Sequence, residues 1–243
     1  SRDRRMLAVG TAEGQIHLWN ARNGGLQHVF RDETPLPPIR KIRFGLGSSL
    51  FGFISKNHHE LIVYETVAPF RRYNFSHQDN ITDFEFSQDG RKAFSICAGS
   101  PTRLHHWNLV TKQKIRGISI FKESRNVQVA FGEGDNLGVF MMNWRMFEWD
   151  MYKKNGGIRS VILKDNFRPG PALLTVDGRH LFRFESKGTR IWDVPTRRAI
   201  GFVDNVPVDT KCVPCVDGRT LIRASDGIAT ALQIVRSDDL EEE

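Results

Sequence analysis

Cysteine is the first residue type in this chain whose spacing could do chemistry. Cys212 and Cys215 have the spacing of zinc sites and redox-active dithiols. A structural zinc site needs about four ligands, and the chain holds only one further cysteine, Cys97. A redox dithiol takes its low pKa from a helix N-terminus, whereas Cys212 lies in a segment with the composition of a strand. We therefore predict buried, chemically inert cysteines and no metal site.

Two pairs of adjacent histidines could supply imidazole ligands, His58-His59 and His105-His106. Neighbouring residues of a strand point to opposite faces, so such a pair cannot chelate one metal ion from a shared face. We expect His58 and His59 in a polar loop beside Glu60. We expect His105 and His106 at a strand edge.

Motifs for phosphate binding and nucleophilic catalysis are weak in this sequence. The glycine-rich run Gly132–Gly138 resembles a phosphate loop, but no Gly-Lys-Ser/Thr follows and no helix is expected after it. The chain has no Gly-x-Ser-x-Gly nucleophile elbow. The sequence also gives no means of placing convergent acidic or histidine side chains in one site. We therefore predict that the protein is not an enzyme and takes no cofactor.

The composition is that of an ordinary globular protein. Of the 243 residues, 40% are hydrophobic and 26% are charged, which excludes a disordered chain. No 18-residue apolar run occurs, so no membrane span is expected. Three cysteines suit a reducing compartment, and we expect an intracellular protein, cytoplasmic or else nuclear. The net charge of +7 makes acidic partners a serious alternative.

The elements that must position any site repeat along the chain. An aromatic residue followed by a polar one recurs at intervals of 45, 43, 42 and 43 residues, at Trp19, Tyr64, Trp107, Trp149 and Trp192. Because these aromatics occupy one position of the repeat, we expect the four tryptophans among them in the core. Internal repeats of this length indicate solenoids, propellers or arrays.

Turn signals and strand patterns divide each repeat further. Asp-Gly pairs at 89–90, 177–178 and 217–218 separate short apolar runs, and glycine accepts the positive φ of a tight hairpin. Segments such as 15–19 alternate polar and apolar residues, and no long stretch has a helical period. Each repeat therefore predicts up to four short antiparallel strands. Such sheets must stack to bury both faces, which predicts an all-β fold, a β-propeller.

The repeat resembles that of the WD40 family of β-propellers over about residues 5–236. Its best matches are Gly10–Asn20 and Thr189–Asp193. The family's Gly-His is matched at most by His77, and the acidic residue of its tight turn is matched best by Asp226. No repeat carries the full His/Ser/Trp/Asp network, so we do not expect its inter-strand hydrogen bonds. The resemblance implies a propeller that serves as a protein-interaction module.

We predict one propeller domain over residues 1–236, followed by an acidic tail or linker at 237–243. Six blades are expected at about 5–33, 38–75, 79–121, 125–165, 169–204 and 208–236. The first blade lacks its first strand and the last lacks its fourth. We therefore expect the natural chain to continue further, and a seven-bladed ring is the alternative to six blades.

The longer, irregular connections between strands are the predicted partner-binding surface, because loops on a rigid scaffold commonly carry recognition. Their aromatic and arginine residues have the composition of interface hot spots. We predict that a protein partner binds there and that the chain is a scaffold or sensor module of a larger signalling protein. The predicted binding residues are Phe121, Arg125, Trp144, Arg145, Phe167 and Arg168.

The alternative partner is a nucleic acid or another anionic surface. In a propeller blade, the turns that join strands one to two and three to four emerge on the same face. These turns are rich in cations, and a converging set of cations attracts phosphates in a salt-dependent way. The residues of this alternative basic face are Arg71, Arg72, Lys112, Lys114, Lys153, Lys154, Arg197 and Arg198.

Overall fold

The structure is a computed structural model of residues 1–243. It describes residues 1, 3–32, 36–45, 48–56, 59–97, 99–120, 127–132, 137–142, 145–153, 157–161, 172–175, 177–204, 211–214, 220–225, 228–233 and 235–236. Strands and the turns between them account for nearly all of these residues. Within them, no helix is long and apolar enough to cross a membrane.

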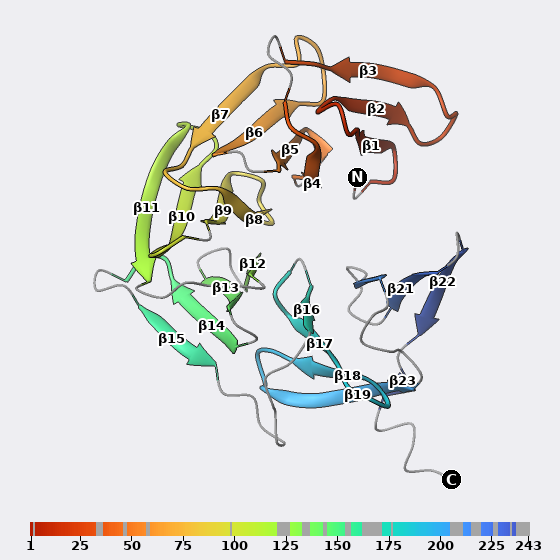
Figure 1. Cartoon of the computed structure of the whole chain (residues 1–243), viewed down its shortest axis with the longest axis vertical. Helices are drawn as coiled ribbons and strands as arrows, with labels where there is room; N and C mark the ends of the chain where they lie inside the picture. The colour runs from red at the N-terminus through yellow and green to blue at the C-terminus, as the bar shows by residue number, and fades with distance from the viewer. Residues whose placement is uncertain are drawn as a thin grey trace. The chain divides into compact units, whose positions relative to one another are not determined.

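The chain divides into two compact units, residues 1–127 and residues 128–243. In the first unit, three antiparallel sheets follow one another, and each pairs its strands in chain order (Figure 1). The first sheet holds β1 (Met6–Gly10), β2 (Ile16–Asn20) and β3 (Leu26–Phe30). The second holds β4 (Ile39–Phe44), β5 (Leu50–Ser55), β6 (Glu60–Glu65) and β7 (Arg72–Ser76). The third holds β8 (Ile81–Phe86), β9 (Lys92–Cys97), β10 (Thr102–Asn108) and β11 (Gln113–Ile120).

The second unit continues the same pattern with three further antiparallel sheets. One holds β12 (Gln128–Phe131), β13 (Leu137–Met142), β14 (Arg145–Asp150) and β15 (Ile158–Val161). The next holds β16 (Ala172–Leu174), β17 (His180–Phe184), β18 (Gly188–Asp193) and β19 (Arg198–Asp204). The last holds β20 (Lys211–Pro214), β21 (Thr220–Ser225) and β22 (Ile228–Gln233), while β23 (Val235–Arg236) pairs with β19 of the preceding sheet.

The β23 pairing changes one expectation. The sequence favours a single strand over residues 228–235, because the run is β-branched and apolar. In the structure that strand ends at Gln233, and Val235 pairs with Phe202 of β19 instead. The described residues thus give three strands to the first sheet and three to the β20–β22 sheet. The number of blades in the natural ring stays a prediction.

The repeated aromatic position forms the core, as the repeat predicts. Trp107, Trp149 and Trp192 are buried, and so is Tyr64, whereas Trp19 is half-buried. Because each lies in the third strand of its repeat, its ring packs between the faces of the sheets. Burying an aromatic side chain of this size contributes about 2–3 kcal/mol.

The Asp-Gly turns are built in the same way in two repeats. Gly90 has φ of 67° and Gly178 has φ of 66°, the left-handed region that glycine enters without steric cost. In each turn the aspartate accepts hydrogen bonds from a side-chain hydroxyl and from a backbone N–H, as Asp89 does from Ser87 Oγ (2.6 Å) and from the amide of Arg91 (2.9 Å). These contacts fix the turns that join β8 to β9 and β16 to β17.

Candidate functional site

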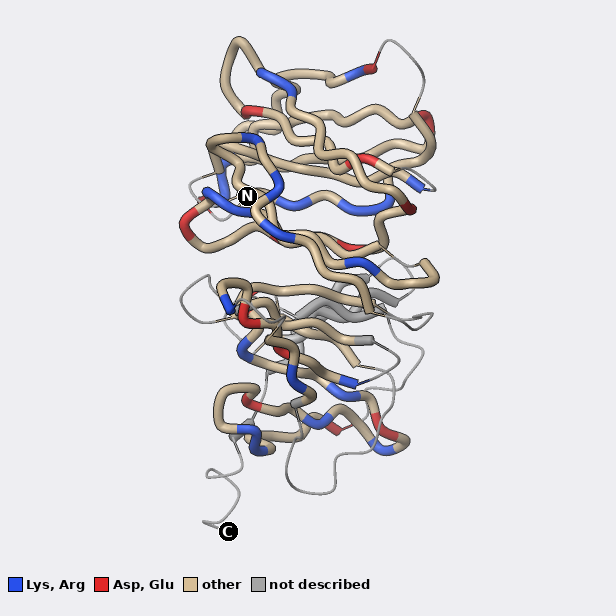
Figure 2. Tube along the Cα trace, turned by 90° about the vertical axis from the view of Figure 1, so that its left-hand side faces the viewer, with Lys and Arg blue, Asp and Glu red and all other residues tan. Residues whose placement is uncertain are grey.

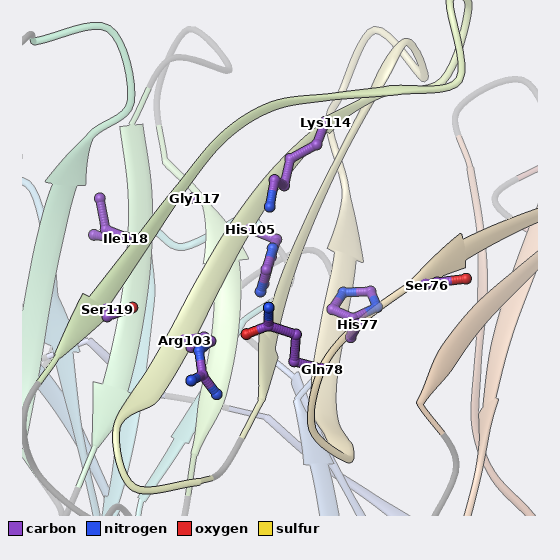
Figure 3. Close-up of a pocket in the computed structure, with 9 residues that line it drawn as sticks. All are labelled: Ser76, His77, Gln78, Arg103, His105, Lys114, Gly117, Ile118 and Ser119. Atoms are coloured by element: carbon purple, nitrogen blue, oxygen red, sulfur yellow. The ribbon is translucent and has the colours of Figure 1, made fainter.

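A pocket of the first unit lies between the end of β7 and the strand pair β10–β11. It is open to solvent and has a volume of about 530 Å³ (Figure 3). We call it the His105 pocket. Its lining residues are Ser76, His77, Gln78, Arg103, His105, Lys114, Gly117, Ile118 and Ser119.

Register and a β-bulge place the lining residues of β10 and β11 on one face. Gly117 pairs with His105, and Lys114 pairs with Trp107 two residues further along β10. The register shifts between these pairs, so Ile115 has no partner in the ladder. Without this bulge, Lys114 and Gly117 would point to opposite faces, because side chains alternate along a strand. The bulge therefore aims Lys114 into the pocket.

His77 is held by a directed chain of hydrogen bonds. Trp107 Nε1 donates to Ser95 Oγ (2.9 Å), which donates to His77 Nε2 (2.7 Å), and His77 Nδ1–H donates to the carbonyl of Phe75 (2.8 Å). Each N–H or O–H group in this series of hydrogen bonds has one acceptor, so the series is complete when His77 is neutral. Burial, with a smaller contribution from the nearby His105, lowers the pKa of His77 from 6.5 to about 3.

This chain corrects the sequence-based expectation that the inter-strand network is missing. Three members of the family's His/Ser/Trp/Asp network are joined in this repeat, namely His77, Ser95 and Trp107. The β9–β10 turn supplies no aspartate. His77 is matched to the family position in the sequence, but Ser95 has no sequence signal of its own, because serine is common at many strand positions.

His105 is the least satisfied group in the pocket. The residue is 6% exposed, and neither ring nitrogen has a hydrogen-bond partner. Its ring stacks on Trp107 with centroids 5.6 Å apart and meets the edge of His77 at 4.8 Å. Burial lowers the pKa of His105 from 6.5 to about 4, with smaller contributions from Lys114 and Arg103. A neutral imidazole presents one donor and one acceptor, and neither is satisfied by the described residues.

Gly117 leaves space beside His105. A Cβ built on Gly117 would lie 3.5 Å from His105 Nδ1 and 3.7 Å from Lys114 Nζ. The same Cβ would lie 3.5 Å from the Leu104 carbonyl oxygen, so a side chain here would meet all three atoms at ordinary contact distance. Lys114 and Gln78 reach toward the imidazole from opposite sides (Figure 3).

Arg103 adds a second cation to the pocket, but Asp79 neutralises part of it. The guanidinium and the Asp79 carboxylate form an ion pair, and both side chains are about one-third exposed or less. Lys114 is exposed and has no ion pair with the carboxylates that the structure describes. The pocket therefore keeps a net positive character.

A smaller pocket of about 280 Å³ lies between the same two sheets, on the side of the β10–β11 turn. Its apolar lining includes Val63, Phe75 and Leu109. Lys112 Nζ lies 3.9 Å from the centre of the Tyr73 ring. This contact holds the Lys112 side chain against Tyr73, because a cation over an aromatic face is favourable.

Two ion pairs with buried carboxylates join β4 to β8, each between residues 42 positions apart in the sequence. Lys41 pairs with Asp83, and Arg43 Nε donates to Glu85 Oε2 at 2.9 Å. Asp83 and Glu85 are 4% and 2% exposed. Burial raises the pKa of Glu85, and Arg43 opposes this rise. Sequence reasoning missed these converging carboxylates, although aligning the repeats at a 42-residue offset finds both pairs.

The predicted partner-binding residues fall mostly outside the described part of the chain. Arg145 is described and lies exposed at the start of β14. The others lie outside the described residues, and these are Phe121, Arg125, Trp144, Phe167 and Arg168. The surface that they would form stays a prediction.

Seven of the eight cations predicted for a basic face are described, and Lys154 is not. Six are exposed and Arg197 is half-buried; the exposed ones are Arg71, Arg72, Lys112, Lys114, Lys153 and Arg198.

Arg72 is already paired with Asp32 through two contacts of 2.8 Å. Lys114 lies in β11 and lines the His105 pocket, so it does not belong to the turn in which the sequence placed it. Figure 2 shows acidic residues interspersed among the cations.

The cysteines and histidine pairs are partly described. Cys97 is a free, buried thiol, and burial raises its pKa to about 12, as expected of an inert cysteine. Cys212 lies in β20, and Cys215 lies outside the described residues.

His105 and His106 are buried within β10, the third strand of its sheet, so their assignment to a strand edge was wrong. In the described part of the chain, no group of three or more His, Cys, Asp or Glu residues could hold a metal ion.

Comparison with solved structures decides the architecture. The β-propeller domain of Myceliophteria thermophila Cps50 (Swd1) matches with a TM-score of 0.71 at 11% identity, over 97% of this chain and 82% of that one. The fold is that of a β-propeller.

Two other solved structures share this propeller fold. Hydrazine synthase from Kuenenia stuttgartiensis matches with a TM-score of 0.71 at 12% identity, over 96% of this chain and 81% of that one. A functionally unknown protein from Desulfotomaculum acetoxidans matches with a TM-score of 0.68 at 13% identity, over 93% and 78%. No family model matches the propeller, and no curated protein does either. At such identities the likeness concerns the fold, because one fold hosts many functions.

Proposed function

We propose that this propeller is a non-catalytic protein-interaction module, built from degenerate WD40-like repeats, that binds a partner protein through its surface loops and pockets. The observation that carries the proposal is the His105 pocket, which is open, positively charged and lined by polar groups. An open polar cleft with unsatisfied hydrogen-bonding groups suits the capture of a polar segment. We expect the module to work inside the cell as part of a larger multidomain protein.

The contacts of the pocket favour binding over catalysis. Ser95 and His77 are 2.7 Å apart, which resembles a nucleophile and its base. However, Ser95 is 0% exposed, so no substrate reaches its hydroxyl. His77 also gives its remaining proton to a backbone carbonyl and holds a pKa of about 3. A base with such a pKa is poorly matched to catalysis near neutral pH.

The main alternative is a nucleic acid or another anionic surface bound by the basic face. Such binding needs several free cations on one surface. In the first unit, Arg72 is paired with Asp32 and Lys112 lies over the Tyr73 ring. These contacts leave fewer cations for phosphates, which favours a protein partner.

The test is affinity capture followed by reconstitution. The tagged chain is used to isolate a partner, which is then purified and titrated by calorimetry at about 0.1 M and about 0.5 M salt. A partner protein that binds with less than about a tenfold loss at the higher salt supports the proposal. Binding of RNA with a steep salt slope, and of no protein, would overturn it, since contact with several phosphates loses orders of magnitude over this range.

A pair of matched variants tests the predicted loop surface. Arg145→Ala removes an exposed arginine from the predicted binding residues, whereas Lys187→Ala removes an exposed cation from a turn of the same unit. We expect Arg145→Ala to weaken the partner about tenfold, the scale of a hot-spot residue, and Lys187→Ala to leave the affinity unchanged. Equal affinities for both variants and the wild type would remove Arg145 from the surface.

A further inference from the structure

We propose that the outer edge of β11, the side away from β10, is a docking site for an acidic, extended segment of the partner protein. The segment adds to the four-stranded sheet as a further antiparallel strand opposite Gly117 and turns its acidic side chains toward Lys114. This inference rests on the proposed function and names the chemistry of the partner.

β11 is the edge strand of its sheet (Figure 1). It runs over eight residues, Gln113–Ile120, and is the longest strand that the structure describes. It pairs with β10 on one side, and no described strand pairs with it on the other. A strand at the edge of a sheet turns backbone N–H and C=O groups away from the ladder, where a further strand can bond to them.

The second unit shows that such an edge accepts a further strand. β23 pairs with β19 on the side away from β18. Trp107 and Trp192 occupy the same position of the repeat, and each follows a bulge that shifts the register with the next strand. Counted from these tryptophans, Gly117 of β11 matches Phe202 of β19, which pairs with Val235 of β23. Gly117 is exposed, and a glycine within a strand suits the close approach of another backbone.

The charge of the β10–β11 hairpin selects an acidic segment. Residues 102–120 hold four cations and no carboxylate, and the cations are Arg103, Lys112, Lys114 and Arg116. Lys114 is exposed, and its side chain lies on the same face of the sheet as position 117. A glutamate opposite Gly117 is a diagonal neighbour of Lys114, at about 7–8 Å between Cα atoms, which a long side chain spans. Opposite charges across strands stabilise the pairing.

The edge of β7, in the neighbouring sheet, lacks this unbalanced charge. Arg72 of β7 is paired with Asp32. Tyr73 donates a hydrogen bond to Glu65 of β6, at 2.6 Å. Carboxylates therefore lie beside β7 and repel a further acidic strand, which makes this edge the matched control.

The experiment titrates the isotope-labelled whole chain with a blocked hexapeptide of alternating glutamate and valine. Amide hydrogen exchange reports which backbone groups the peptide protects. We expect saturable protection of those amides of Gln113–Ile120 that exchange fast in the free chain, and none along Arg72–Ser76. Protection of β7 instead of β11, or of neither strand, would overturn the proposal. Slow exchange of every β11 amide in the free chain would also overturn it and indicate that another part of the chain, such as the acidic residues 237–243, occupies the edge.

Two methylated peptides separate strand pairing from charge attraction. Both keep all the glutamate side chains, and they carry N-methyl groups on the glutamate amides in one and on the valine amides in the other. The backbone groups of successive residues point to opposite edges of a strand, so only one set of amides faces β11. We expect one methylated peptide to lose binding and the other to keep it. Undiminished binding of both would show charge attraction alone and overturn the proposal.

Two variants of equal net charge tie the result to β11. Lys114→Glu turns an attraction at the docking edge into a repulsion and should weaken the peptide at least about tenfold. Lys112→Glu changes a residue that lies over the Tyr73 ring and should weaken it less than about threefold. Equal losses in the two variants would overturn the proposal. The methylated peptides test the same claim on the wild-type chain.

Failure here and failure of the proposed function are distinguishable. If the captured partner binds and leaves the exchange of β11 unchanged, the docking edge is wrong and the interaction module stands. If no protein partner is captured and reconstituted, the proposed function itself is wrong.

Discussion

Buried neutral histidines should make this propeller sensitive to mild acid. His105 and His106 are 6% and 0% exposed, and burial lowers both pKa values from 6.5 to about 4. Between these values the unfolded chain binds more protons than the folded one, so the free energy of unfolding falls as pH falls. The loss begins as pH drops below about 7 and continues down to about 4.

The magnitude follows from the shift. Lowering the pH from about 7.5 to about 5 brings it about 1.5 units below the pKa of a histidine in the unfolded chain. Each of these units lowers the free energy of unfolding by about 1.4 kcal/mol per histidine. Each histidine therefore costs about 2 kcal/mol, and the two together cost about 4 kcal/mol. His77, whose pKa burial lowers to about 3, adds to this loss in the same direction, so about 4 kcal/mol is a lower bound. A loss of about 4 kcal/mol is a large part of the unfolding free energy of a typical domain, which is roughly 5–15 kcal/mol.

The assay is urea unfolding at a series of pH values. The slope of the unfolding free energy against urea concentration should stay the same at each pH, which serves as the check. The variant His105→Phe keeps a ring against Trp107 and removes one titrating group, so the pH-dependent loss should fall by about 2 kcal/mol. Variant His106→Phe should behave alike. A loss below about 1 kcal/mol in the wild type, or an unchanged loss in both variants, would refute this account of the buried histidines.

Three further predictions concern packing and buried polar groups, each measured as the change in urea unfolding free energy. Gly52→Ala should destabilise by about 1–3 kcal/mol, because its Cβ would lie 2.7 Å from the Phe86 ring; a neutral result would contradict the packing between β5 and β8. Ser95→Ala should cost about 1–3 kcal/mol, since two buried partners lose their bond, whereas Ser55→Ala removes a buried hydroxyl without a partner and should cost less than about 0.5 kcal/mol. Glu85→Gln should cost about 1–3 kcal/mol, because Arg43 loses a charge-assisted hydrogen bond while its half-exposed guanidinium stays hydrated; equal stability would show that this ion pair is dispensable.

The periodic features of the fold could be predicted from the sequence. The interval between aromatics locates the third strand of each repeat, and Trp107, Trp149 and Trp192 are buried as expected. The positive φ of Gly90 and Gly178 follows from the Asp-Gly pairs. Both are local properties, because side-chain period and turn chemistry depend on a few consecutive residues.

The pocket could not be predicted in the same way. Lys114 faces it only because a bulge at Ile115 shifts the register, and a bulge leaves no clear mark in a two-residue pattern. His105 was misplaced because two adjacent histidines suggest an exposed segment, whereas stacking on Trp107 and an edge contact with His77 bury the ring. The contacts that decide the site therefore join residues of different strands.

Photo-crosslinking from the His105 pocket tests the central claim most directly. The variant Ile118→p-benzoylphenylalanine places the crosslinker on β11 at the pocket. We predict that illumination joins it to the purified partner, and that the same crosslinker in place of Lys187, an exposed turn residue of the second unit, gives no adduct. Partner binding at full affinity without any adduct at position 118, or an equal adduct from position 187, would contradict the account.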